Sequence, residues 1–229
     1  MVDASVPTDA NNALHFNGSD YATTGTANFP TASSPQTISL WARPSRFDGM
    51  DQVIITLRRN EQSGVEFGVR DGTFAAWSVL GEATLVQGPP PPSDGAWHHI
   101  AYVLDVPAGG PVATLYLDGA AIAKTAANPN NLTPLSSWIG SLEGLTAFYS
   151  GDIDELRIWS LARTAAGVLE DMQGTTNSAS PGLVAYYNFD AIQGSTVLDL
   201  SGNGNNATLG GGDPDASPTL IPSDVPPSP

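Results

Sequence analysis

The sequence of 229 residues contains no cysteine and a single lysine, Lys124. Without cysteine there is no disulfide framework, no thiolate chemistry and no cysteine-based zinc site, so packing must hold the fold, alone or with another metal. No run of the sequence approaches the roughly 18 apolar residues that a membrane helix needs, which argues against insertion into a membrane.

Charge is scarce and has mostly one sign. Only 14% of the residues are charged, where about 25% is usual, and 8 basic residues stand against 23 acidic ones, giving a net charge of −15. Such a surface repels phosphate backbones and anionic lipid surfaces, which excludes nucleic acid and membrane surfaces as partners, and it attracts cations, calcium above all. We expect a secreted protein, extracellular or at the cell surface, because Thr, Ser, Asn and Gly replace the usual charges.

One domain with two tails is predicted. Residues 1–12 form an N-terminal extension that lacks the basic and apolar regions of an export signal, so any signal has been removed or lies elsewhere in a longer exported protein. Residues 210–229 are rich in Pro and Gly, which resist helix and sheet, and they are predicted to be a tail or linker. The domain itself spans residues 13–209.

Short apolar runs with period-two alternation fill this domain and end at Gly, Pro, Asn or Asp. They predict strands at residues 14–16, 37–42, 53–57, 65–69, 73–80, 97–104, 113–117, 121–125, 136–139, 153–159 and 183–189. Asp118-Gly119 predicts a tight hairpin turn. One short helix is predicted from an N-cap at Thr164 to Gly174, with Val168, Leu169 and Met172 on one face. Strand and helix do not alternate, so we expect an all-β, two-sheet antiparallel jelly-roll sandwich.

Five motifs occur in a characteristic order, and each is weak alone. They are Ala13 to Tyr21, Thr37 to Trp41 with Arg43-Pro44, Trp97 to Tyr102, Thr114 to Gly119, and Gly151 to Trp159. Together they resemble the laminin-G-like and pentraxin-like family of concanavalin A-like jelly rolls, over about residues 13 to 200. The segment from Gly182 to Asn205 either closes this sandwich or begins a second repeat, and we favour closure because the Pro-rich segment follows it.

The resemblance implies an extracellular binding or adhesion module for glycans or a protein partner. A homo-oligomer of the pentraxin kind, a structural module that self-assembles without a glycan, is the first alternative. A polysaccharide hydrolase is the second, since Asp152 and Asp154 alternate onto one strand face. The third acid of such a site is missing near Arg157, so we expect no catalytic residues. His98 and His99 point to opposite faces and do not form a zinc site.

The resemblance also implies a structural calcium at Asp154, with the turn 17–20 as a donor of carbonyl oxygens. A second set of oxygen ligands is Asp190, Asp199, Asn203 and Asn205, although residues 201–205 also suit a simple tight turn. The pentraxin-type ligand site would use Glu143, Asn60 and Glu61, but Leu142 and Leu145 interrupt its run of ligands.

A sugar site needs a flat apolar ring for stacking and nearby planar polar groups. The candidates near predicted loops are Trp77, Phe148 and Tyr149, whereas Trp41, Trp97 and Trp159 lie in strands that this family buries. The four prolines at positions 89–92 form either a docking strip for a partner or a rigid loop.

Overall fold

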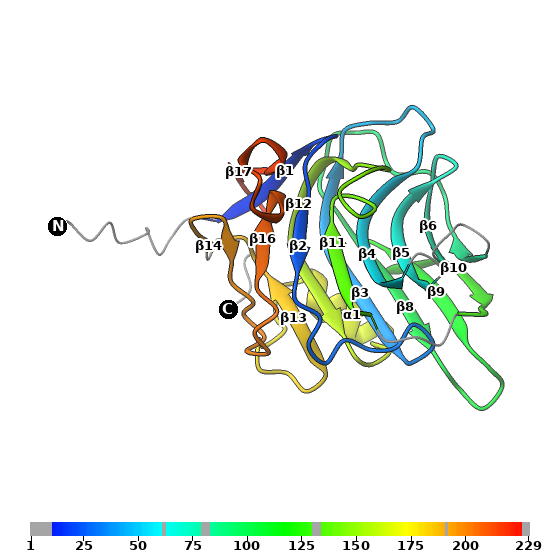
Figure 1. Cartoon of the computed structure of the whole chain (residues 1–229). Coiled ribbons are helices and arrows are strands. Elements are labelled where there is room, and N and C mark those ends of the chain that lie inside the picture. Colours follow the sequence, from blue (N-terminus) through cyan, green and yellow to red (C-terminus); the bar gives the residue numbers. More distant parts are fainter. Residues whose placement is uncertain (1–10, 61–62, 79–82, 130–133, 191, 226–229) are drawn as a thin grey trace.

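The computed structural model describes residues 11–60, 63–78, 83–129, 134–190 and 192–225. The chain forms two antiparallel sheets packed face to face, with one short helix on the outer side of one of them (Figure 1). The all-β two-sheet sandwich predicted from the alternation of apolar and polar residues is therefore confirmed.

The first sheet has eight strands, seven of them in the order β10-β9-β8-β3-β12-β1-β17. The eighth, β13, pairs with residues 156–159 of β12, after the residues 150–153 that pair with β1. Its strands are β1 (Asn12–Asn17), β3 (Gln36–Pro44), β8 (His98–Asp105), β9 (Val112–Leu117), β10 (Ala120–Ala126), β12 (Ser150–Trp159), β13 (Leu183–Tyr187) and β17 (Thr219–Pro222). Asp118 and Gly119 both have positive φ in the turn between β9 and β10, as the hairpin motif predicts.

The second sheet has nine strands, in the order β14-β15-β16-β2-β11-β4-β5-β6-β7. Its strands are β2 (Ala22–Thr24), β4 (Gln52–Asn60), β5 (Ser63–Arg70), β6 (Thr73–Ser78), β7 (Thr84–Gln87), β11 (Ser136–Ile139), β14 (Ile192–Gln193), β15 (Thr196–Val197) and β16 (Ala207–Leu209). The shortest strands escaped prediction because two or three residues carry no measurable alternation.

The core lies between the two sheets and is built from alternate residues of each strand. In β1, Leu14 and Phe16 are fully buried and point inward, while His15 points to the outer face. The chain then passes close to the Phe16 ring at Gly140, where φ is +85° and an added Cβ would overlap that ring. Glycine is required at this position both by the backbone angle and by the space.

The helix α1 (Ala165–Met172) begins where the sequence predicts, since the Thr164 hydroxyl accepts the Gly167 N–H at 3.1 Å. Its inner face differs from the prediction. Val168 is buried against the outer face of the eight-stranded sheet, but Leu169 is 39% exposed and Asp171 is buried instead. The Asp171 carboxylate accepts hydrogen bonds from Ser39, Arg163 and Thr176, which satisfies its charge under the helix. Among the described residues, no helix has both the length and the apolar character to cross a bilayer.

The C-terminal part of the chain completes both sheets. Strand β13 pairs with β12, and β16 pairs with β2, so the segment after Gly182 closes this sandwich, as favoured from the sequence. The predicted tail is corrected, because β17 pairs with β1 and residues up to 225 are folded against the domain. Asn12 already belongs to β1, so the N-terminal extension is shorter than predicted.

Candidate functional site

The three aromatic side chains proposed for sugar stacking lie in different environments. Trp77 is only 3% exposed on β6 and packs against the loop residue Leu142. Tyr149 is fully buried in the core and its hydroxyl donates to the Asp152 carbonyl at 3.3 Å. Neither ring offers a face to solvent: residues of the loop after β11 pack against Trp77, and Tyr149 lies in the core between the sheets. Phe148 is half-buried, and it lines a surface hollow described below.

Asp154 is completely buried on the outer face of the eight-stranded sheet. Its two carboxylate oxygens accept the Glu155 N–H at 2.7 Å and the Ser223 hydroxyl at 2.6 Å. Burial is the main cause that raises the pKa of Asp154 to about 8, which favours the neutral acid. Asn17 pairs with Ser150, four positions from Asp154 along β12 and so about 13 Å away. The early turn and Asp154 therefore do not share one site.

The second predicted set of ligands closes a turn. Asp199 accepts hydrogen bonds at 2.9 to 3.0 Å from three backbone N–H groups, those of Tyr186, Ser201 and Asn205. The Asn205 side chain accepts the Ala27 N–H at 2.6 Å, and the Asn203 amide donates to a backbone carbonyl. Because these oxygens accept from N–H groups of the backbone, they hold the turn in place.

The remaining predicted ligands are dispersed. Asp190 accepts the Asn12 N–H at 2.7 Å, and Glu143 forms an ion pair with Arg58 at 2.9 Å. The side chain of Asn60 and all of Glu61 lie outside the described residues. Within the parts of the chain that the structure describes, no group of three or more His, Asp or Glu side chains is placed to hold a metal ion. The structure therefore does not bring the predicted acidic ligands together within the described residues.

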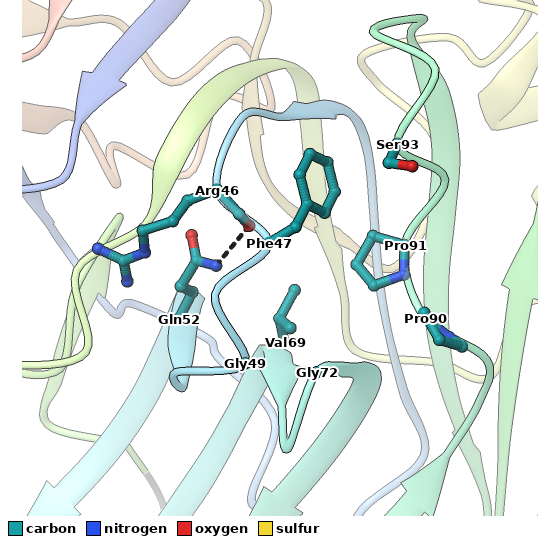
Figure 2. A pocket seen from close by; sticks show the side chains of 9 residues that line it. All are labelled: Arg46, Phe47, Gly49, Gln52, Val69, Gly72, Pro90, Pro91 and Ser93. Atoms are coloured by element: carbon teal, nitrogen blue, oxygen red, sulfur yellow. Dashed lines mark hydrogen bonds between the residues drawn. The ribbon is translucent and has the colours of Figure 1, made fainter.

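A hollow of about 210 Å³ opens between the loop at residues 45–51, the turn between β5 and β6, and the proline segment 89–92. We call it the Phe47 hollow. Figure 2 shows the rings of Phe47 and Pro91 turned toward each other, with Val69 below them. Phe47 is 48% exposed although it is a large apolar side chain. Its lining is completed by Arg46, Gly49, Gln52, Gly72, Pro90 and Ser93.

Hydrogen bonds hold the 45–51 loop in place. The buried Gln52 side chain donates to the Arg46 carbonyl at 3.0 Å, and its carbonyl oxygen accepts the Ser150 N–H at 3.1 Å. The dashed line in Figure 2 marks the first of these bonds. Since Gln52 belongs to β4, the aromatic loop is attached directly to the sheet. The backbone beside Phe47 is therefore anchored to the sheet.

The opposite wall is equally fixed. The Pro89 carbonyl accepts the Phe74 N–H at 3.0 Å, which attaches the proline segment to β6. Beyond the proline segment, the His98 ring bonds to the Asp94 carboxylate at 3.2 Å and to the Asp118 carboxylate at 2.8 Å. Burial lowers the pKa of His98, but the bonds to Asp118 and Asp94 outweigh burial and raise it. Proline rings add a stiff apolar surface at little entropic cost.

The sequence contains a signal for this site outside the three aromatic residues predicted for stacking. Phe47 stands in the polar, glycine-containing stretch Arg46-Phe47-Asp48-Gly49 between two strands, where an aromatic ring has no core to enter. The proline segment 89–92 is predicted as a docking strip or a rigid loop, but only the tertiary structure brings it opposite Phe47. The arrangement offers one exposed aromatic ring, Phe47, and the exposed Pro90 beside the buried Pro91, with a polar rim, which suits stacking on a ring-shaped ligand.

Among solved structures, a putative carbohydrate-binding protein from Bacteroides ovatus is 20% identical with a TM-score of 0.69. The match covers 97% of this chain and 62% of that protein, so the chain spans less than two thirds of its length. A heptameric SAP-like pentraxin from Limulus polyphemus is 17% identical, with a TM-score of 0.52, over 74% of this chain and 82% of that one.

A third similar structure is domain 4 of AbnA, a GH43 extracellular arabinanase from Geobacillus stearothermophilus, in complex with arabinotriose. It is 19% identical with a TM-score of 0.51, and the match covers 70% of this chain and 87% of that domain. Identities this low establish a common fold and no more. No curated protein matches the sequence.

The sequence itself matches the Laminin_G_3 family model over residues 16–169. This span runs from the end of β1 through most of α1 and contains the strands around the Phe47 hollow. The family match thus covers more than half of the chain, and the fold agrees with it: the chain belongs to the Laminin_G_3 family of the concanavalin A-like lectin/glucanase superfamily.

Proposed function

We propose that this domain is a carbohydrate-binding module and that the Phe47 hollow is its sugar site. The observation that carries the proposal is the exposed Phe47 ring, held 48% open to solvent opposite Pro90 and Pro91. A large apolar ring kept in water by a fixed loop costs solvation free energy, and a ligand that covers it recovers that free energy. The apolar face of a sugar ring has the matching shape and chemistry.

The polar rim supplies orientation. Ser93 is exposed at the edge of the hollow, and the Arg46 backbone contributes to its wall. Hydroxyl groups around a bound sugar ring would hydrogen-bond to such groups while the ring itself stacks on Phe47. Two structural neighbours support this assignment, since one is described as a putative carbohydrate-binding protein and another was determined with arabinotriose.

The module would act outside the cell or on its surface, in adhesion to glycan-bearing material or in holding a larger protein to it. The extracellular arabinanase among the neighbours supports this location, as does the low lysine content. Binding is favoured over hydrolysis because the two candidate acids are occupied. Asp152 is held by His15 and Arg43 at 2.7 Å each, and Asp154 is buried beneath Ser223. A module that self-assembles without a glycan should bind no polysaccharide and should form oligomers in light scattering.

The test is binding to a panel of neutral plant and microbial polysaccharides by affinity electrophoresis and calorimetry. We expect retention on at least one polysaccharide, and Phe47→Ala should weaken it about tenfold or more, the loss typical of a central aromatic contact. Leu145→Ala is the matched control, because Leu145 is 73% exposed and does not line this hollow. No retention of the unmodified protein would reject carbohydrate binding, and equal retention of Phe47→Ala would reject this site.

A further inference from the structure

A second hollow lies beside the first and shares Arg46 with it. It has a volume of about 280 Å³ and is lined by Gly18, Arg46, Met50, Asp51, Ala147 and Phe148. We call it the Phe148 hollow. Both hollows belong to the same 45–51 loop, which contributes Phe47 to one and Met50 to the other.

Arg46 lies at the boundary between the two hollows. Figure 2 shows its side chain directed away from the Phe47 ring, and its guanidinium donates to the Phe148 carbonyl at 2.9 Å. The backbone carbonyl of Arg46 accepts the hydrogen bond that the Gln52 side-chain amide donates. Arg46 therefore lines both hollows, whereas Phe47 lines only the first.

Each hollow offers an apolar surface to water. Met50 is 63% exposed and Phe148 is half-buried in the second hollow, as Phe47 is 48% exposed in the first. Arg46 lines both hollows, and its polar guanidinium bonds to the Phe148 carbonyl on the side of the second one. An oligosaccharide has the same alternation, since each ring has an apolar face and the linkages and hydroxyls between rings are polar. The order apolar, polar, apolar along the protein matches two successive rings.

The size of the hollows agrees with two units rather than one. Neither hollow alone reaches the roughly 300 Å³ at which ligand pockets usually begin, but the two together fall within the usual range. A ligand that filled only the Phe47 hollow would leave Met50 and Phe148 exposed. A chain that continued past Arg46 would cover them as well.

The surrounding charges select against acidic sugars. The Arg46 guanidinium lies 3.5 Å from the Asp48 carboxylate, and Asp51 also lines the second hollow. The cation of Arg46 is thus paired with one carboxylate, a second carboxylate lines the same hollow, and the chain has a net charge of −15. The local field and the field of the whole molecule both repel a uronate or sulfated unit.

We infer that the two hollows form one extended site that binds at least two successive units of a neutral oligosaccharide across Arg46. This inference rests on the proposed carbohydrate-binding function and adds to it the length and charge of the ligand. It requires the Phe148 hollow to act as a second subsite.

The experiment measures affinity against arabino-, xylo-, cello- and manno-oligosaccharides of one to six units, with oligogalacturonates as the acidic series. For the neutral series that binds, we expect affinity to rise about tenfold or more from one unit to the length that spans both hollows, and then to level off. Met50→Ala should reduce the affinity for the longer oligomers severalfold and leave the single unit unchanged, whereas Phe47→Ala should weaken every length. Leu145→Ala remains the control.

The outcomes separate the two proposals. If single units and oligomers bind equally, and Phe47→Ala weakens both, the extended site is rejected while carbohydrate binding stands. If Met50→Ala weakens single units as much as oligomers, the two hollows are not separate subsites. Tighter binding of oligogalacturonates than of the neutral series rejects the preference for neutral chains. If no series binds, both proposals fall. Met50 and Phe47 are both exposed, so the variants should fold, and thermal melting checks this.

Discussion

At the level of single residues, a buried carboxyl group attaches the last strand to the sandwich. Asp154 accepts the Ser223 hydroxyl just beyond β17, in a place that water does not reach. Burial is the largest influence on its pKa, and the nearby Glu155 and Asp190 raise it further, while the bonds from Ser223 and the Glu155 N–H lower it. The result is a pKa of about 8, so the group is mostly neutral at pH 7.

This residue makes stability depend on pH in a defined direction. A carboxyl group with a raised pKa stabilises the folded state fully below its unfolded pKa near 4, and that stabilisation is lost as the pH rises through the folded value of about 8. Asp154→Asn removes the titration and keeps a polar partner for Ser223. We therefore expect the free energy of unfolding of the variant, relative to the unmodified protein, to increase between pH 4 and pH 9 by about 1 kcal/mol or more.

Urea denaturation of both proteins at several pH values measures this difference. Glu66 is also buried, and burial is the main cause that raises its pKa to about 7, but it is present in both proteins and cancels. Parallel stability profiles for the two proteins would show that Asp154 is ionised in the folded state as it is in the unfolded chain.

At the level of elements, the last strand closes one edge of the eight-stranded sheet. Residues 219–222 of β17 pair with residues 12–15 of β1, and the Asn11 side chain bonds to the carbonyls of Ser223 and Val225. These contacts join the two ends of the described chain. Strand β1 would otherwise be an edge with unpaired backbone groups.

Truncation tests the contribution of this element. Removing residues 218–229 deletes the β17 ladder and the bond to Asp154, and we expect a loss of about 2 kcal/mol or more, seen as a fall in melting temperature of about 5 °C. Removing only residues 226–229 is the matched control, and it should leave the melting temperature unchanged. Equal melting of the two truncated proteins would contradict a structural role for β17.

At the level of the whole molecule, the net charge of −15 is spread over a surface with few cations. Several of the 8 basic residues are already paired with carboxylates, as Arg43, Arg58 and Arg163 are. The remaining carboxylates repel one another across the surface, and this repulsion opposes the compact state.

Salt should therefore stabilise the protein. We expect the melting temperature to rise by a few degrees, roughly, when sodium chloride is increased from low concentration to a few tenths molar, because the Debye length shortens to about 10 Å or less. At pH 4, where many exposed carboxylates are protonated, the effect should shrink. Differential scanning calorimetry at both pH values makes the comparison, and a melting temperature that falls with salt at pH 7 would contradict it.

The sequence predicted what depends on local pattern. Alternating apolar residues specified the longer strands, Thr164 specified the start of the helix, and Asp118-Gly119 specified a hairpin turn, because each effect acts between residues close in the chain. The ordered motifs specified the family. The inner face of the helix was only partly predicted, since burial of Asp171 requires Ser39 and Thr176 from elsewhere in the fold.

The candidate site was decided by tertiary structure. Whether Trp77 or Phe47 meets solvent depends on which loop folds back over which strand, and periodicity carries no information on that. Strand β12 contains an irregularity between Asp154 and Arg157, with Glu155 at a φ of +54°, that no local signal announces. By itself, the sequence determined the two layers and their longer strands, because burial alternates along such strands. Only the packing of distant segments decided which polar groups are buried, that β17 closes the sheet, and that Phe47 faces a wall of prolines, because these depend on contacts between residues far apart in the chain.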